Sequence, residues 1–273
     1  MNTLMESRLK GVRHIKKENC SVFYITSLTE DLKSVIRSRL SSICFGAAAA
    51  ASNQVMYCYK NTLKEFIERY SGKSENYQKG MIGELLLHIL IAELLNEFQI
   101  DSPFFNLEER SIKKGFDVIL NKQGSPDIWL AEVKSGEIHS GKNSSETAIE
   151  LISTAQNDLD KRLNEESFSL WLNAVHDARI AIDNSRDDRD AIISILECTG
   201  AKASESGLSS TDFNVILSGT LFHPLSDYIN MNDVTQKQID IINSKTFNDV
   251  YVVAIQKKTY TAVYNFLKSE SEL

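Results

Sequence analysis

Hydrophobic and polar residues in the first quarter of the chain alternate in patterns typical of one strand and two helices. A β-branched and aromatic run at residues 22–25 predicts a strand. Thr29 can cap a helix, and apolar residues recur at helical spacing after it, so a helix is expected from Thr29 onward. A second helical pattern covers about residues 62–70, and a polar loop is expected at residues 71–76.

This polar loop is the best candidate boundary between two parts of the chain. We expect residues 1–74 to form a mainly helical N-terminal part, which could dock a partner, and residues 75–273 to form a second domain. The second part opens on the most apolar stretch of the chain, which predicts a buried helix over roughly residues 77–98.

Short extended segments are expected after this helix. They lie at residues 104–107, 115–120 and 128–134, with a turn at residues 121–126 before the last of them. A second long helix is expected at about residues 146–164.

The last third of the sequence predicts more strands, at residues 192–196, 214–221 and 249–255. A charged stretch at residues 183–190 is expected to be an exposed loop or the start of a helix. The order of helix, strands, helix and strands predicts an α/β fold with one mixed sheet flanked by helices.

Composition is that of an ordinary soluble globular protein, with 273 residues, 42% hydrophobic and 25% charged. The longest apolar run, residues 85–95, is too short and too polar to cross a bilayer, and the N-terminus lacks the apolar core of a secretory signal. We therefore expect no membrane contact. The four cysteines are scattered without a C-x-x-C pair, which favours reduced thiols in a cytoplasmic protein.

The formal net charge of −7 bears on any interaction with nucleic acid. Proteins that bind DNA on their own usually neutralise phosphates with a basic surface. If this chain acts on DNA, a local basic patch or a partner must supply much of the affinity.

Acidic residues in apolar surroundings mark one candidate site. Glu84 lies on the apolar helix, Asp117 on the strand expected at residues 115–120, and Glu132 and Lys134 on the strand expected at residues 128–134. Strand periodicity places Glu132 and Lys134 on one face. Burying such charges is costly unless they are paired or bind a cation.

This set of residues suits metal-assisted phosphodiester hydrolysis. Mg²⁺ prefers oxygen ligands, and Asp117 and Glu132 on neighbouring strands can converge on one ion. Lys134 can then hydrogen-bond the attacking water and offset negative charge in the transition state. An isolated E-x-K triplet is weak evidence, because about one arises by chance in a chain of this length. The alternative is a salt-bridged pair exposed at a sheet edge.

The four residues together resemble the motif of the PD-(D/E)xK superfamily of restriction-endonuclease-like nucleases. The resemblance implies that residues 75–273 form a nuclease domain. It further implies that Glu84, Asp117 and Glu132 bind Mg²⁺, for which Mn²⁺ can substitute, and that Lys134 completes the catalytic set.

The resemblance covers about residues 80–163, and it includes one departure and one uncertain position. Phe116 stands where the superfamily motif has a proline, which weakens the match more than the mechanism. Gln156 is similar to a helix glutamine of some members, but a solvated glutamine explains it equally well.

A narrower resemblance is to the nuclease subunit of the Hachiman anti-phage system. It is carried by the start of the apolar helix at residues 79–84, by the order of segments 115–117 and 131–134, and by the acidic balance and total length. This resemblance implies DNA as substrate, a role in antiviral defence and a heteromeric complex with a superfamily 2 helicase. The alternative is a non-catalytic subunit that keeps the nuclease fold as an interaction or sensor module of a DNA-processing complex.

Other polar residues have simpler interpretations. Asp127 is more typical of a turn, Glu137 and His139 of a solvated loop, and His88 of a buried core residue. Two basic clusters could contact phosphate but are by default solvated surface: Lys113 and Lys114, and Lys10, Arg13, His14, Lys16 and Lys17.

Overall fold

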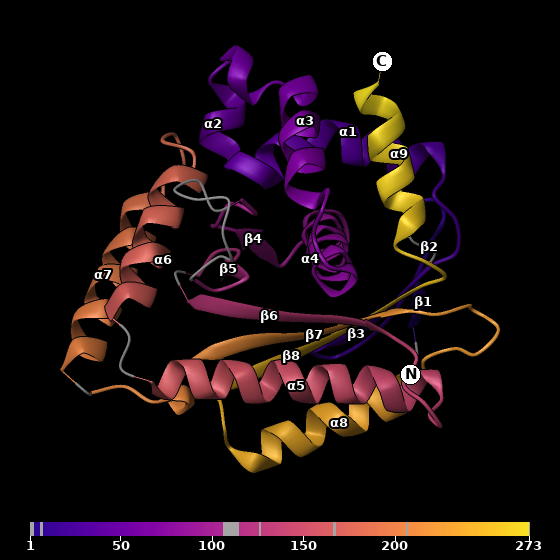
Figure 1. Ribbon diagram of the computed structural model, residues 1–273. Coiled ribbons are helices and arrows are strands. Elements are labelled where there is room, and N and C mark those ends of the chain that lie inside the picture. Colours follow the sequence, from indigo (N-terminus) through magenta and orange to yellow (C-terminus); the bar gives the residue numbers. More distant parts are fainter. Residues whose placement is uncertain are drawn as a thin grey trace.

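An eight-stranded mixed sheet runs through the part of the chain that the structure describes (Figure 1). The computed structural model describes residues 3–5 (backbone only), 8–105, 115–125, 127–165, 168–205 and 207–272. The strand order is β1-β2-β3-β8-β7-β6-β5-β4; β3, β8, β7 and β6 are parallel, and both edges are antiparallel. The strands are β1 Thr3–Met5, β2 Val12–Lys17, β3 Cys20–Ile25, β4 Phe98–Ile100, β5 Val118–Lys122, β6 Ile128–Glu137, β7 Asn214–Phe222 and β8 Asp249–Lys257.

Helices cover both faces of this sheet. The α-helices are α1 Glu30–Phe45, α2 Ala47–Ala51, α3 Tyr59–Tyr70, α4 Glu75–Leu94, α5 Ser144–Asn164, α6 Phe168–Ala181, α7 Arg189–Ser204, α8 Met231–Ser244 and α9 Thr261–Ser271. Figure 1 shows α5 and α8 along one face, α4 on the other, and α1, α3 and α9 stacked outside α4. A large hydrophobic cluster fills each side of the sheet. The predicted α/β fold with a mixed, helix-flanked sheet is therefore confirmed.

Two glycines let α4 and α5 lie close to the central strands. A Cβ added at Gly83 of α4 would lie 1.9 Å from the Ser135 Oγ of β6 and 3.0 Å from its Cβ. On the other face, a Cβ at Gly219 of β7 would lie 2.9 Å from the Ala148 carbonyl oxygen of α5. Both contacts are closer than real side chains allow, so each glycine is required for the close helix–sheet packing that positions the site.

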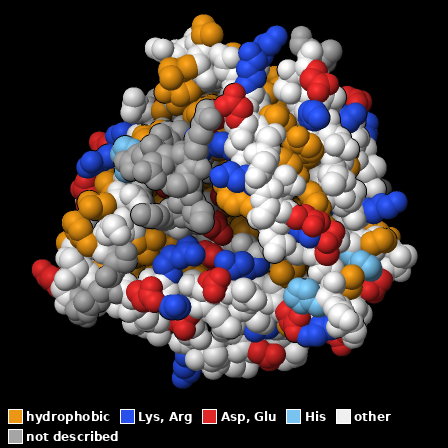
Figure 2. Space-filling view, in the orientation of Figure 1, with side chains coloured by type: hydrophobic (Ala, Val, Ile, Leu, Met, Phe, Trp, Pro, Cys, Tyr) orange, Lys and Arg blue, Asp and Glu red, His pale blue; other side chains and the backbone are white. Residues whose placement is uncertain are grey.

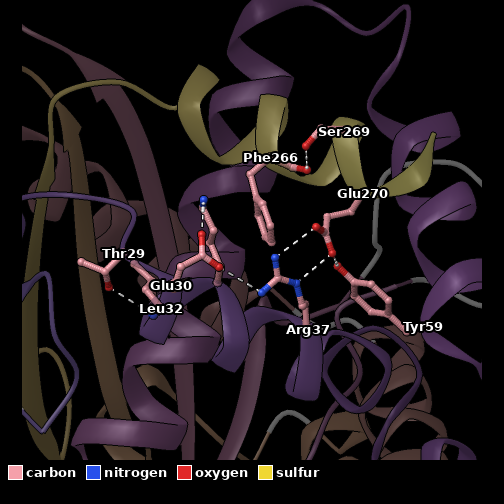
Figure 3. A network of polar contacts seen from close by, with 9 residues as sticks. Thr29, Glu30, Leu32, Arg37, Tyr59, Phe266, Ser269 and Glu270 are labelled. Atoms are coloured by element: carbon pink, nitrogen blue, oxygen red, sulfur yellow. Dashed lines mark hydrogen bonds and ion pairs between the residues drawn. The ribbon is translucent and has the colours of Figure 1, made fainter. Parts of the chain in front are cut away.

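The N-terminal residues share the sheet and both core clusters with the rest of the chain. Strand β3 pairs in parallel with β8, and α1 begins after a Thr29 cap whose side chain accepts from the Leu32 N–H, as predicted. Figure 3 shows Arg37 of α1 forked onto Glu270 of α9, with nitrogen–oxygen distances of 2.8 and 3.1 Å. The division at residue 74 stays a prediction, although α4 does begin directly after it, at Glu75.

Most predicted elements are confirmed, and three are corrected. Residues 192–196 belong to helix α7 and not to a strand, because Ile192 and Leu196 bury one helical face. The apolar helix ends at Leu94, and residues 98–100 form β4 instead. Phe104 and Phe105 are not in a strand; their N–H groups donate to carbonyls of α1, and residues 106–107 lie outside the described part.

Candidate functional site

The candidate site lies where β5 separates from β6. The pairing of these strands ends with Val118 opposite Ala131, so beyond that point β7 is the one strand beside β6 among the residues that the structure describes. A cavity of about 400 Å³ opens at this free edge, between α4 on one face of the sheet and α5 on the other. Glu84, Asp117, Glu132 and Lys134 all line it, so the structure brings together the four residues singled out by the sequence.

Asp117 is fixed at the open edge of β6 by a backbone contact. It directly precedes β5, and its Oδ2 accepts a hydrogen bond of 2.8 Å from the Val133 N–H. Because β5 has already separated, this carboxylate satisfies a strand N–H that would otherwise lack a ladder partner. Asp117 is thereby held beside Glu132, the neighbour of Val133 in the chain.

Glu132 is 1% exposed and accepts hydrogen bonds at both oxygens. Its Oε1 accepts from Lys134 Nζ at 2.8 Å and from Arg162 Nη2 at 3.2 Å, and its Oε2 accepts from Arg162 Nη1 at 3.0 Å. Burial and then the nearby Asp117 charge raise the pKa of Glu132 to about 7, while Arg162 and Lys134 act in the opposite direction. The Asp117 carboxylate therefore lies close enough to Glu132 for the two charges to repel each other.

Lys134 lies on the same face as Glu132, as predicted. Its Nζ donates to Glu132 and also reaches the Asp158 Oδ2 of α5, at 2.7 Å. Burial lowers the pKa of Lys134, but the carboxylates of Glu132, Asp158 and Asp117 outweigh burial, so the pKa lies above its ordinary value. Lys134 is therefore a permanent cation at neutral pH, and 26% of its side chain is exposed at the cavity.

Two residues of the site, Asp158 and Arg162, were missed by the sequence analysis. They are four residues apart on α5 and contact residues two apart on β6, Asp158 with Lys134 and Arg162 with Glu132. One helical turn of four residues rises about 6 Å, and two strand residues span about 6.6 Å, so the two charge pairs match. The i, i+4 spacing of opposite charges was a visible signal, but nothing local showed which strand it faces.

Glu84 approaches the cavity from the opposite side of the sheet. It lies on α4 one residue after Gly83, and its Oε1 is 3.9 Å from the Nε2 of His88, one turn further along. His88 is fully buried, as expected for a core residue. The close packing of α4 on β6 is what carries Glu84 to a cavity that it shares with residues facing α5.

The donor set of the cavity fits a hard divalent cation in its chemistry. Three carboxylates, Glu84, Asp117 and Glu132, line one space, and oxygen ligands are those that Mg²⁺ prefers. Within the described ranges, however, the side chains do not place three or more His, Cys, Asp or Glu residues around a common point. Glu132 is instead engaged by Lys134 and Arg162. Metal binding at these residues stays a prediction, and it requires some of these side chains to move.

Other candidates from the sequence lie in ordinary structural contacts. Gln156 accepts from Lys237 of α8 at 3.0 Å and is not among the residues lining the cavity. Asp127 is exposed at the turn before β6, where its N–H donates to the Ser125 hydroxyl. Glu137 pairs with Lys79 at 2.7 Å, and His139 with Glu150 at 2.6 Å.

The basic clusters contribute little that the structure can place at the cavity. In the N-terminal cluster His14 is buried and stacks on Phe23, while Lys10 pairs with Asp31 and Lys16 with Glu97. Lys113 and Lys114 lie outside the described residues. Instead, Arg69 and Arg162 line the cavity, and Figure 2 shows lysine and arginine side chains around a hollow on this face.

Fold and site together define an α/β protein with a charged cleft at the free edge of a central strand, closed by a helix from each face of the sheet. The model of one family, HamA, matches residues 3–270, nearly the whole sequence. The chain therefore belongs to the HamA family, that of the Hachiman anti-phage defence protein, and the narrower resemblance is confirmed. No curated protein matches the chain. Among the described residues, no helix is long and apolar enough to span a membrane.

Proposed function

We propose that this chain is a metal-dependent deoxyribonuclease of the PD-(D/E)xK type and the effector of a Hachiman complex. The observation that carries the proposal is the meeting of Asp117, Glu132 and Lys134 at one cavity, opposite Glu84. These residues come from the segment before β5, from β6 and from α4, and no structural requirement of the sheet explains three carboxylates and a lysine around an open space. The four cysteines are free, in keeping with a cytoplasmic site of action.

Each residue has a role that its surroundings support. Asp117, Glu132 and Glu84 would hold Mg²⁺ or Mn²⁺. The bound ion would neutralise phosphate charge and make water more acidic. Lys134 stays protonated, so it acts as a hydrogen-bond donor and a fixed positive charge near the scissile phosphate, not as a general base. Asp158 holds the lysine in place from α5.

The alternative is a non-catalytic subunit that keeps the fold. Its support is that Glu132 already has cationic partners, as in a purely structural ion-pair network. Against it, such a network would not need Asp117 and Glu84 at the same cavity. The two functions differ in whether phosphodiester bonds are cleaved at all.

Plasmid cleavage separates these functions. The purified chain, alone and with its helicase, is incubated with supercoiled DNA in Mg²⁺ or EDTA, with an RNA of equal length as a second substrate. We expect nicked or linear DNA in Mg²⁺, intact DNA in EDTA and no cleavage by Lys134→Ala. DNA that stays intact in every condition, with the helicase present, would favour the non-catalytic subunit.

We further propose that a superfamily 2 helicase delivers the DNA. The net charge of −7 disfavours tight DNA binding by the chain alone. Two large apolar side chains of the N-terminal part are exposed to solvent: Val55 is 78% exposed and Met56 is 60% exposed. We expect them to contact the helicase. The alternative is that residues 1–74 only cover one face of the sheet.

Co-purification tests this docking. Val55→Ser with Met56→Ser should release the helicase, while Phe168→Ser with Leu172→Ser, at similarly exposed positions on α6, should not. The isolated chain should bind DNA weakly and in a salt-sensitive way in gel-shift experiments. Tight DNA binding and unrestrained cleavage by the isolated chain would contradict the proposed partnership.

A further inference from the structure

We infer that Arg162 is a positioning residue that holds Glu132 when no nucleic acid is bound and transfers to a substrate phosphate when nucleic acid enters the cavity. This transfer would make the binding of a divalent cation depend on the binding of nucleic acid. The inference rests on the proposed function, and it concerns how the binding of nucleic acid activates the same site.

The first observation is that the guanidinium of Arg162 occupies the positions beside the Glu132 carboxylate that a bound divalent cation would need. Its Nη1 and Nη2 contact the two oxygens of Glu132 at 3.0 and 3.2 Å, so the guanidinium spans the whole carboxylate. Lys134 adds a third donor at 2.8 Å. Glu132 is almost completely buried, so it has no room to turn toward another partner while Arg162 stays. A divalent cation on the same carboxylate would meet a like charge at contact distance.

The second observation is that Arg162, unlike Lys134, has a route away from Glu132. Arg162 lines the cavity and is 30% exposed, and within the described part of the chain its one contact besides Glu132 is with the Gly115 carbonyl oxygen, at 3.0 Å. A phosphate, like a carboxylate, offers two oxygens that can accept two parallel N–H hydrogen bonds, so arginine binds both in a forked geometry. Lys134 is held between Glu132 and Asp158 and would remain.

Coupling follows from these contacts by linkage. If nucleic acid draws Arg162 away, Glu132 gains capacity for the cation, and by reciprocity the cation strengthens nucleic-acid binding. The free protein would then bind Mg²⁺ weakly and remain inactive until DNA is present. This also accounts for three carboxylates that share a cavity without standing around one point.

The test measures Mn²⁺ binding by electron paramagnetic resonance, with and without a short phosphorothioate DNA duplex that resists cleavage. The wild-type chain should bind Mn²⁺ about tenfold tighter with the duplex than without it, within the usual range for coupled sites. Arg162→Ala should bind Mn²⁺ about tenfold tighter than the wild type without duplex, and the duplex should add little. Arg162→Gln, similar in size and uncharged, replaces Arg162→Ala if that variant does not fold.

The matched control is Arg69→Ala. Arg69 lines the same cavity and forms an ion pair with Glu65, one turn earlier on α3, so the variant removes an equal charge and leaves the contacts of Glu132 with Arg162 and Lys134 in place. Its response to the duplex should equal that of the wild type. Equal gains in Mn²⁺ affinity for Arg69→Ala and Arg162→Ala would overturn the inference, since general electrostatics would then explain both.

A further variant distinguishes failure of the inference from failure of the proposed function. Glu132→Gln should lose Mn²⁺ binding. If Glu132→Gln binds Mn²⁺ as well as the wild type, the proposed metal site is wrong. If Glu132→Gln loses the ion but Arg162→Ala leaves its affinity and its coupling to DNA unchanged, the metal site stands and the role of Arg162 is refuted.

Discussion

Two buried carboxylates in this molecule have almost the same burial, pKa and kind of cationic partner, but they differ in the residues around them. Glu132 is 1% exposed and bonded to Arg162; Asp101 is fully buried and bonded to Arg186 at 2.6 Å. Burial is the largest cause that raises the pKa of each, a nearby carboxylate adds to the rise and the arginine offsets part of it, so that each pKa is about 7. By burial and pKa alone, the two residues cannot be told apart.

Their neighbours separate them. Glu132 lies beside Asp117 and Lys134 on a cavity, at an open strand edge. Asp101 follows β4, and its arginine also bonds Asn121 of β5 and Asp188, so the cluster ties the segment before α7 to the edge of the sheet. Perturbed pKa values therefore mark burial, and it is the convergence of several charges on an accessible space that marks a site.

The largest expected difference is in cleavage. Glu132→Ala and Lys134→Ala should each lower the rate of Mg²⁺-dependent DNA cleavage about a thousandfold or more, because both act at the reacting phosphate. Asp101→Asn should leave the rate per folded molecule unchanged. Lys134→Ala should retain Mn²⁺ binding, since lysine is not a ligand. Full activity of either cavity variant would place the catalytic group elsewhere.

The next difference is in stability. Arg186→Ala leaves Asp101 buried without its cation and should lower the free energy of unfolding by about 3 kcal/mol. Arg162→Ala should cost only about 1 kcal/mol, because Lys134 still contacts Glu132 and the cavity admits water. Urea unfolding followed by circular dichroism measures both. A larger loss for Arg162→Ala would show that the cavity cluster serves mainly to hold the fold.

Two glycines of helix α4 are a matched pair of positions for testing the close packing that brings Glu84 to the cavity. Gly83→Ala forces a Cβ against Ser135 and should cost about 1–3 kcal/mol. Gly80→Ala, one turn earlier, meets nothing within 4 Å and should stabilise the helix by up to about 1 kcal/mol. Thermal unfolding compares the two. Equal effects would mean that α4 does not depend on close contact with β6.

The smallest expected effect is the pH dependence of Asp101. Its pKa is about 7 in the folded protein, against an ordinary value of 3.8, so folding favours its protonated form. The associated stability is fully present below about pH 4 and is lost as pH rises through 7. Relative to Asp101→Asn, the wild type should lose about 1 kcal/mol of unfolding free energy between pH 6 and pH 7. Parallel pH profiles for the two proteins would contradict the assigned pKa.

The sequence predicted strands β3, β6, β7 and β8 and the four residues that line the cavity, because their signals are local. The apolar helix around Glu84 and the strand bearing Glu132 and Lys134 each carry their pattern within a few residues. What the sequence missed depends on contacts between distant segments. Arg162 belongs to the site only because α5 packs antiparallel to β6, and the cavity exists only because β5 separates at Val118.

Short or charged segments were also missed for physical reasons. Strand β2 carries four basic residues in six positions, counting His14, and is extended because it pairs with β3 and not because of its own pattern. Residues 192–196 have the composition of a strand, yet they form a helix because α6 provides a surface for one helical face. In both cases tertiary contacts overrode local preference.

The most direct test of the central claim is the position of the metal. Crystals of the chain with a phosphorothioate duplex and Mn²⁺, measured near the manganese absorption edge, would locate the ion by anomalous scattering. We expect a peak in the cavity, coordinated by Asp117 and Glu132, with Arg162 turned toward a phosphate. A peak away from these carboxylates, or an empty cavity at a Mn²⁺ concentration that supports cleavage in solution, would contradict it.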